Sequence, residues 1–181
     1  MKKEKEEAIS AVKYLIEYFG ESMDREGIKK TPERVLRAYR ELLRGNFEEM
    51  PKLTTFESSY DQMVVVSHIK CISLCLHHTL PIILEASVGY IPDKKVIGIS
   101  KIPRLVKWCC ARLAIQEDLT GWIADLLMKH LKPLGVMVVL KGRHLCMEIR
   151  GAKTRAPVVT SAIRGIFKEP EKYGFEGIHP V

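Results

Sequence analysis

Two short segments rich in cysteine and histidine place the tightest demand on how this chain folds. The first contains Cys75, His77 and His78, and the second, far downstream, contains His144 and Cys146. Thiolates and imidazoles are preferred zinc ligands, and three protein ligands with one open position are typical of catalytic zinc sites. A fold that brings the two segments together would make the chain a candidate metalloenzyme.

Composition limits the class of protein. The chain has 181 residues, 46% of them hydrophobic and 28% charged, which is enough to bury the core of one domain without cross-links. Five cysteines cannot all pair with one another, and no apolar run has the length of a membrane helix, so we expect a cytoplasmic protein. The formal net charge of +7 favours an anionic partner without distinguishing nucleic acid from nucleotide.

Hydrophobic periodicity predicts four helices. They cover about residues 4–19, a segment from Thr31 to just before Gly45, a segment from Ser100, and a segment around 119–130. Thr31 is the expected N-cap of the second helix, with Pro32 in its first turn.

Runs of β-branched residues predict the strands of a sheet at 63–72, 84–90, 136–140, 144–149 and 158–167. In the strand predicted at 144–149, alternation would place His144, Cys146, Glu148 and Arg150 on one face and the apolar residues on the other. Three further cysteines are expected to pack in the core: Cys71, Cys109 and Cys110. The alternative for Cys71, which could share a strand face with Cys75, is an additional metal ligand.

A zinc site could combine Cys75, Cys146 and one imidazole of the adjacent His77–His78 pair. In an extended segment the two imidazoles would point in opposite directions, so one would bind metal while the other faced substrate as an acid or base. His144 is a second candidate for proton transfer. The same residues also fit a closed structural zinc site, or buried cysteines and hydrogen-bonded histidines without metal.

Basic side chains recur around the predicted site. Guanidinium groups bind phosphate with two parallel hydrogen bonds, and helix N-termini add amide donors, so we expect a polyphosphate pocket. Each arginine alone would usually be a solvated charge. The polar pair Gln116–Glu117 either starts a helix or recognises a base edge. The basic residues are Arg34, Arg37, Lys101, Arg104 and Arg150.

Taken together, the motifs resemble GTP cyclohydrolase I. The resemblance is collinear and covers about four fifths of the chain, which makes it far more specific than any single motif. It runs through Thr31–Val35, Tyr90–Pro92, Val96–Lys101, Ile115–Thr120 and His144–Gly151.

The resemblance implies a role for each candidate residue. Cys75, His78 and Cys146 would hold zinc, while His77 and His144 would transfer protons. The substrate contacts that it implies are Glu117 and Gln116 on guanine, Ser100 in the pocket, Lys101, Arg104 and Arg150 on the triphosphate, and Arg34 with Arg37 from a neighbouring subunit.

The resemblance also implies a reaction and a fold. GTP and water would become 7,8-dihydroneopterin triphosphate and formate, through ring opening at C8, an Amadori rearrangement and ring closure, in pterin and folate biosynthesis. The implied fold is the α+β tunnelling fold, an antiparallel four-stranded sheet with helices on one side. Its subunits form rings, a pentamer or two stacked as a decamer, with active sites between subunits. We therefore expect an N-terminal helical extension at 1–60, a catalytic domain at 61–181, and no nucleic-acid or membrane partner.

Several positions depart from the family pattern. Leu76 stands where a glutamate is usual, Leu84 where a glycine is usual, Ser87 where histidine is common, and the residues from about Glu169 do not match. One alternative is therefore a tunnelling-fold variant that stops at a ring-opened intermediate or acts on a related purine or pterin. Another is a basic, zinc-stabilised nucleic-acid-binding module, which the dispersed basic residues and the lack of interleaved aromatic residues disfavour.

Overall fold

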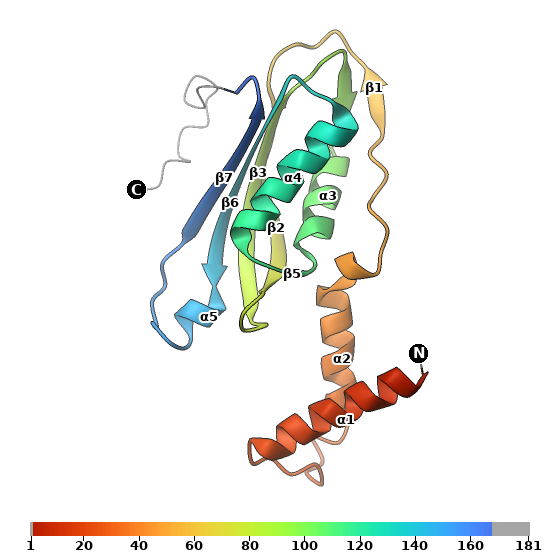
Figure 1. Cartoon of the computed structure of the whole chain (residues 1–181), viewed down its shortest axis with the longest axis vertical. Coiled ribbons are helices and arrows are strands. Elements are labelled where there is room, and N and C mark those ends of the chain that lie inside the picture. The colour runs from red at the N-terminus through yellow and green to blue at the C-terminus, as the bar shows by residue number, and fades with distance from the viewer. Residues whose placement is uncertain (1, 168–181) are drawn as a thin grey trace. The chain divides into compact units, whose positions relative to one another are not determined.

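The computed structural model describes residues 2–167 (Figure 1). By its internal contacts the chain divides into two compact units, Met1–Leu43 and Arg44–Val181. The second unit therefore begins before residue 60, and the division into a 1–60 extension and a 61–181 catalytic domain stays a prediction. The mismatch noted from Glu169 lies outside the described residues.

The first unit consists of α1 (Lys2–Tyr18) and α2 (Thr31–Leu42), which contact each other. Gly20 follows α1 with φ of +88°, a conformation that glycine adopts without strain, as the expected helix stop requires. Thr31 was wrongly predicted as the N-cap of α2. Lys30 occupies that position without a side-chain hydrogen bond, while Pro32 lies in the first turn, where no helical N–H bond is lost.

The second unit is built on one sheet with the strand order β5-β2-β3-β6-β7. Its four long strands are antiparallel neighbours, and only the short β5 runs parallel to β2. This confirms the predicted antiparallel four-stranded sheet and adds a fifth strand to its edge. The strands are β2 (Val64–Cys75), β3 (Pro81–Ile91), β5 (Leu113–Ala114), β6 (Gly135–His144) and β7 (Val158–Gly165).

Two helices, α3 (Lys101–Cys110) and α4 (Gln116–Leu131), cover one face of this sheet (Figure 1). Leu119, Ile123 and Leu127 recur at helical spacing along α4 and are fully buried. They pack against the inward-facing residues of the sheet in a single core, which confirms the predicted α+β class with helices on one side. A short 3-10 helix (Arg44–Asn46) and a separate pair of strands, β1 (Thr55–Glu57) and β4 (Lys95–Ile97), complete the unit.

The three cysteines assigned to the core are buried, as predicted. Burial raises the pKa of Cys109 to about 12, so its thiol stays protonated and unreactive near neutral pH. Within residues 2–167, no helix combines the length and the apolar character needed to cross a membrane.

The strand predicted at 144–149 is wrong. His144 is the last residue of β6, and Leu145–Glu148 form the short helix α5. The pairing explains the change, because His144 opposes Ile82 near the start of β3, and β7 pairs with β6 only as far as Gly142. Beyond His144 the backbone has no neighbouring strand, and Ile149 instead donates its N–H to the Leu145 carbonyl at 3.0 Å.

Candidate metal centre and active site

The first segment of the metal centre is a tight turn between β2 and β3. Cys75 ends β2, and its N–H donates to the Leu80 carbonyl at 2.8 Å while its own carbonyl accepts from the Thr79 N–H at 2.8 Å. Thr79 has φ of +53°, which reverses the chain at this point. His77 and His78 therefore lie in a turn, and the extended conformation predicted for them is wrong. Two backbone hydrogen bonds hold this ligand-bearing loop in shape.

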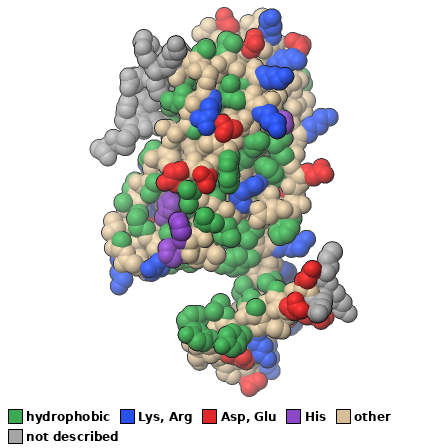
Figure 2. Space-filling view, viewed as in Figure 1, with side chains coloured by type: hydrophobic (Ala, Val, Ile, Leu, Met, Phe, Trp, Pro, Cys, Tyr) green, Lys and Arg blue, Asp and Glu red, His purple; other side chains and the backbone are tan. Residues whose placement is uncertain are grey.

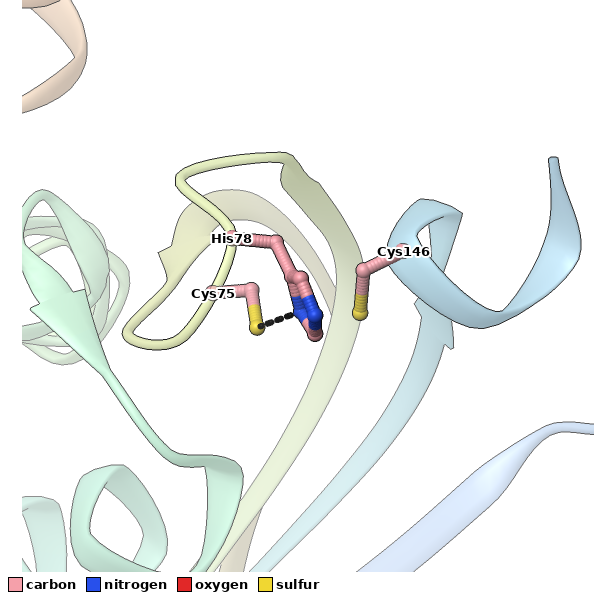
Figure 3. A group of neighbouring side chains, drawn as sticks. All are labelled: Cys75, His78 and Cys146. Atoms are coloured by element: carbon pink, nitrogen blue, oxygen red, sulfur yellow. Dashed lines mark hydrogen bonds between the residues drawn. The ribbon is translucent and has the colours of Figure 1, made fainter. Parts of the chain in front are cut away.

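The second segment reaches the same place through α5. Cys75, His78 and Cys146 present ligand atoms that all lie within 4.8 Å of one another (Figure 3). The Cys75 Sγ to His78 Nδ1 distance is 3.7 Å, and ligand atoms on one tetrahedral zinc ion lie roughly 3.5–3.8 Å apart. The structure thus brings together the three residues predicted as ligands, in a donor set that fits zinc with one position open.

Without a bound metal, the thiol of Cys146 is protonated near neutral pH. Burial raises the pKa of its thiol, the neighbouring Cys75 raises it further, and the positive charge of Arg150 opposes both effects. Metal binding at this cluster would therefore displace thiol protons, because thiolate is the form that binds zinc.

His77 projects from the same turn as the cluster and is exposed to solvent. Its ring centroid lies 6.2 Å from that of His78, with the two planes at 64°. Figure 2 shows histidine side chains gathered on the surface of the second unit, with acidic side chains beside them. Both imidazoles are exposed, and they differ in that His78 belongs to the ligand cluster whereas His77 does not.

His144 is held at the junction of β6 and α5, two residues before Cys146. Its Nε2 lies 3.0 Å from Oε1 of Gln116, the first residue of α4. Burial lowers the pKa of His144, and the nearby carboxylate of Glu117 partly opposes that effect. A half-buried imidazole kept neutral near pH 7 is suited to accept or donate a proton.

Comparison with known proteins decides the family. A family model described as GTP cyclohydrolase I matches residues 8–177. The GTP cyclohydrolase 1 of Campylobacter jejuni is 49% identical over 165 residues, covering 89% of this chain and 87% of that protein. The chain belongs to the GTP cyclohydrolase I family. The GTP cyclohydrolase 1 of Streptomyces avermitilis is 45% identical over 168 residues, covering 90% of this chain and 84% of that one. Among solved structures, the archaeosine synthase QueF-Like in its apo form gives a TM-score of 0.49 at 20% identity, covering 57% of this chain and 94% of that one.

Within one chain of this GTP cyclohydrolase I family member, only some of the residues predicted to bind substrate lie beside the metal centre. Glu117 is exposed in the first turn of α4 and acts electrostatically on His144, and Arg150 follows α5 and acts on Cys146. Gln116 differs, since it is 1% exposed and has no free surface toward a ligand.

Ser100, Lys101 and Arg104 lie at the start of α3, whereas the end of that helix leads into β5, which pairs with β2 at Cys75. The ten residues of α3 rise roughly 15 Å, so Ser100 and Lys101 lie about the length of the helix from its end near β5, and Arg104 lies roughly 9 Å from that end. Arg34 and Arg37 are exposed on α2 of the first unit.

Two features of the site were missed in the sequence. Gly142 lies in β6 directly under the Gln116 amide, and a side chain there would overlap that amide. A glycine inside a strand often marks the close approach of another group. The position of Gly142 in the sequence could therefore have indicated this contact. The other is a partly buried hydrogen bond from the Gln116 amide to the hydroxyl of Thr160 in β7, for which the sequence gave no sign.

Proposed function

We propose that this chain is a zinc-dependent GTP cyclohydrolase I that converts GTP and water to 7,8-dihydroneopterin triphosphate and formate. The observation that carries the proposal is the convergence of Cys75, His78 and Cys146, with His77 next to His78 and His144 two residues before Cys146. Family membership supports the substrate and the reaction.

Cys75, His78 and Cys146 would hold the metal. When bound, zinc supplies a Lewis acid and lowers the pKa of water at its open position toward neutrality. The loop hydrogen bonds at Cys75 and Thr79 fix two of the three ligands before metal arrives, which reduces the cost of assembling the site.

The two other imidazoles divide the proton transfers of the reaction between them. His77 is exposed at the turn and is placed to exchange protons with a bound substrate and with solvent. His144 is half-buried and neutral and is placed to serve the ring nitrogens or ribose oxygens in the more sheltered part of the site.

Recognition of GTP would use both ends of the nucleotide. Glu117 offers a carboxylate that can accept hydrogen bonds from the N–H groups of guanine, and Arg150 offers a guanidinium to the phosphates. We assign Ser100, Lys101 and Arg104, with Arg34 and Arg37, to substrate binding in a site completed by a second copy of this chain. The separation of the α3 start from the metal centre within one chain supports that assignment.

The active form would accordingly be a ring-shaped homo-oligomer, a pentamer or decamer, with sites between subunits. Closing the ring would pair the outer strands of the sheet with those of neighbours, and exposed strand edges are otherwise a liability. We place the enzyme in the cytoplasm, where reducing conditions keep Cys75 and Cys146 available as metal ligands.

The test is to incubate the zinc-loaded protein with GTP and to follow formate release and product mass together. Formate with the mass of dihydroneopterin triphosphate supports the full reaction. A ring-opened product alone would favour the arrested variant, and no change in GTP would contradict the proposal. His144→Ala is the matched variant: it should retain zinc while losing at least about 100-fold in turnover, and loss of zinc from it would contradict the separation of metal binding from proton transfer.

A further inference from the structure

We propose that Gln116 is a positioning residue for His144 and not a substrate contact. Its side chain fixes a proton on Nε2 of His144 and leaves Nδ1 as the atom that exchanges a proton with the substrate. The catalytic part of this inference rests on the proposed function, whereas the position of the proton does not.

The orientation of the Gln116 amide follows from its partners. Its Nε2 lies 3.0 Å from the Leu140 carbonyl oxygen and 3.1 Å from the Val158 carbonyl oxygen. Carbonyl oxygens only accept hydrogen bonds, so the amide atom facing them must be the NH₂ group. The opposite atom, Oε1, therefore faces His144.

A pair of threonines reinforces that orientation. Thr120 donates its only hydroxyl hydrogen to the Gln116 backbone carbonyl at 2.7 Å, so at 2.6 Å from Thr160 it can only accept. Thr160 must then donate to Thr120, which leaves the Thr160 oxygen to accept from the Gln116 NH₂ group at 3.1 Å. The two hydrogens of the NH₂ group are shared among three acceptors, the Leu140 and Val158 carbonyls and the Thr160 hydroxyl, and reversing the amide would turn its oxygen toward all three.

The proton on His144 is fixed by this orientation. Gln116 Oε1 can only accept, so the His144 Nε2 at 3.0 Å must donate. The imidazolium carries hydrogen on both ring nitrogens and can always donate to Gln116. The neutral ring can donate only if its single N–H hydrogen is on Nε2. Among residues 2–167 the His144 Nδ1 has no hydrogen-bond partner, and it is therefore the ring atom available to a ligand.

The packing around Gln116 excludes direct contact with substrate. Its side chain is 1% exposed, and its amide lies against the bare Cα of Gly142. Glu117, the next residue, is exposed. The two adjacent residues thus have different roles in this proposal: Glu117 contacts the ligand, and Gln116 orients the imidazole of His144.

The first experiment locates the proton directly. In protein labelled with ¹⁵N at histidine, the spectrum of His144 distinguishes a protonated from an unprotonated ring nitrogen, with His144→Ala used for assignment. The expected result is hydrogen on Nε2 and a bare Nδ1 when the ring is neutral. Neutral His144 with its hydrogen on Nδ1 would overturn the inference, and this readout is independent of whether GTP is turned over.

The second experiment separates positioning from binding. Gln116→Met keeps the shape of the side chain without its acceptor, and it should lower kcat on the order of 10- to 100-fold while changing KM by less than about twofold. Glu117→Gln is the matched neighbour and should mainly raise KM. A raised KM with unchanged kcat in Gln116→Met would overturn the inference.

Discussion

Gly142→Ala is the substitution that most directly tests how closely the sheet and α4 approach at the site. A Cβ at residue 142 would overlap Oε1 of Gln116 and lie 3.0 Å from Cδ2 of Leu84. Because several acceptors hold the Gln116 amide, it cannot move aside without losing hydrogen bonds. Overpacking of a core costs about 1–3 kcal/mol, and one or two lost hydrogen bonds add about 1 kcal/mol each.

Part of this cost is offset in the unfolded state, because alanine has less backbone freedom than glycine, by about 0.4–1 kcal/mol. The expected net loss is about 2–3 kcal/mol in the free energy of unfolding, equivalent to a fall in Tm of roughly 4–12 °C. Since His144 depends on Gln116, kcat should also fall.

The assay is thermal and urea denaturation of wild type and variant at one protomer concentration, because the apparent stability of an oligomer depends on concentration. Gly121→Ala is the control. Gly121 lies inside α4, and the nearest atom to an added Cβ is the end of the flexible Arg164 side chain at 3.8 Å. That change should stabilise the protein by about 0.5–1 kcal/mol. If Gly142→Ala stays within about 0.5 kcal/mol of wild type, the tight contact between Gln116 and β6 is refuted.

Three further changes test the metal centre and its surroundings. Cys146→Ser should lose zinc, measured by elemental analysis, whereas Cys110→Ala, outside the cluster, should retain it; equal zinc content would contradict the ligand assignment. Leu76 is 51% exposed, so Leu76→Glu should leave Tm almost unchanged while slowing loss of zinc to a chelator, and faster loss would count against a supporting carboxylate there. Hydrogen bonds from Arg143 hold the pKa of Glu148 below its ordinary value of 4.5. The ionised form therefore stabilises the fold above that value, and this contribution is lost as pH falls through the lowered pKa. Glu148→Gln should be less stable than wild type in urea at neutral pH, with a gap that closes in acid; a gap independent of pH would refute the ion-pair explanation.

Local sequence was sufficient for the elements that local forces determine. The apolar spacing of α4 and the β-branched runs of β2, β3 and β6 predicted helices and strands where the structure has them, because periodicity reports which face of an element is buried. The predicted ligands Cys75, His78 and Cys146 also come together. Their residue types alone left other arrangements open, and the collinear family motifs selected this set.

The sequence failed where a residue's conformation depends on what lies next to it in space. Residues 145–148 have strand-like alternation, but the neighbouring strands end at this point, so the chain turns into a helix to satisfy its own backbone. The family resemblance implied that Gln116 helps Glu117 to recognise guanine, which stays a prediction beside the positioning role proposed above. The burial of Gln116 against Gly142 and its bonds to β6 and β7 exist only once α4 packs on the sheet. The sequence by itself thus determined the elements, the family and the chemical groups of the site. Tertiary structure alone decided which of those groups are exposed and which are buried and hydrogen-bonded, because hydrogen-bond direction and burial are properties of neighbours that are distant in the chain.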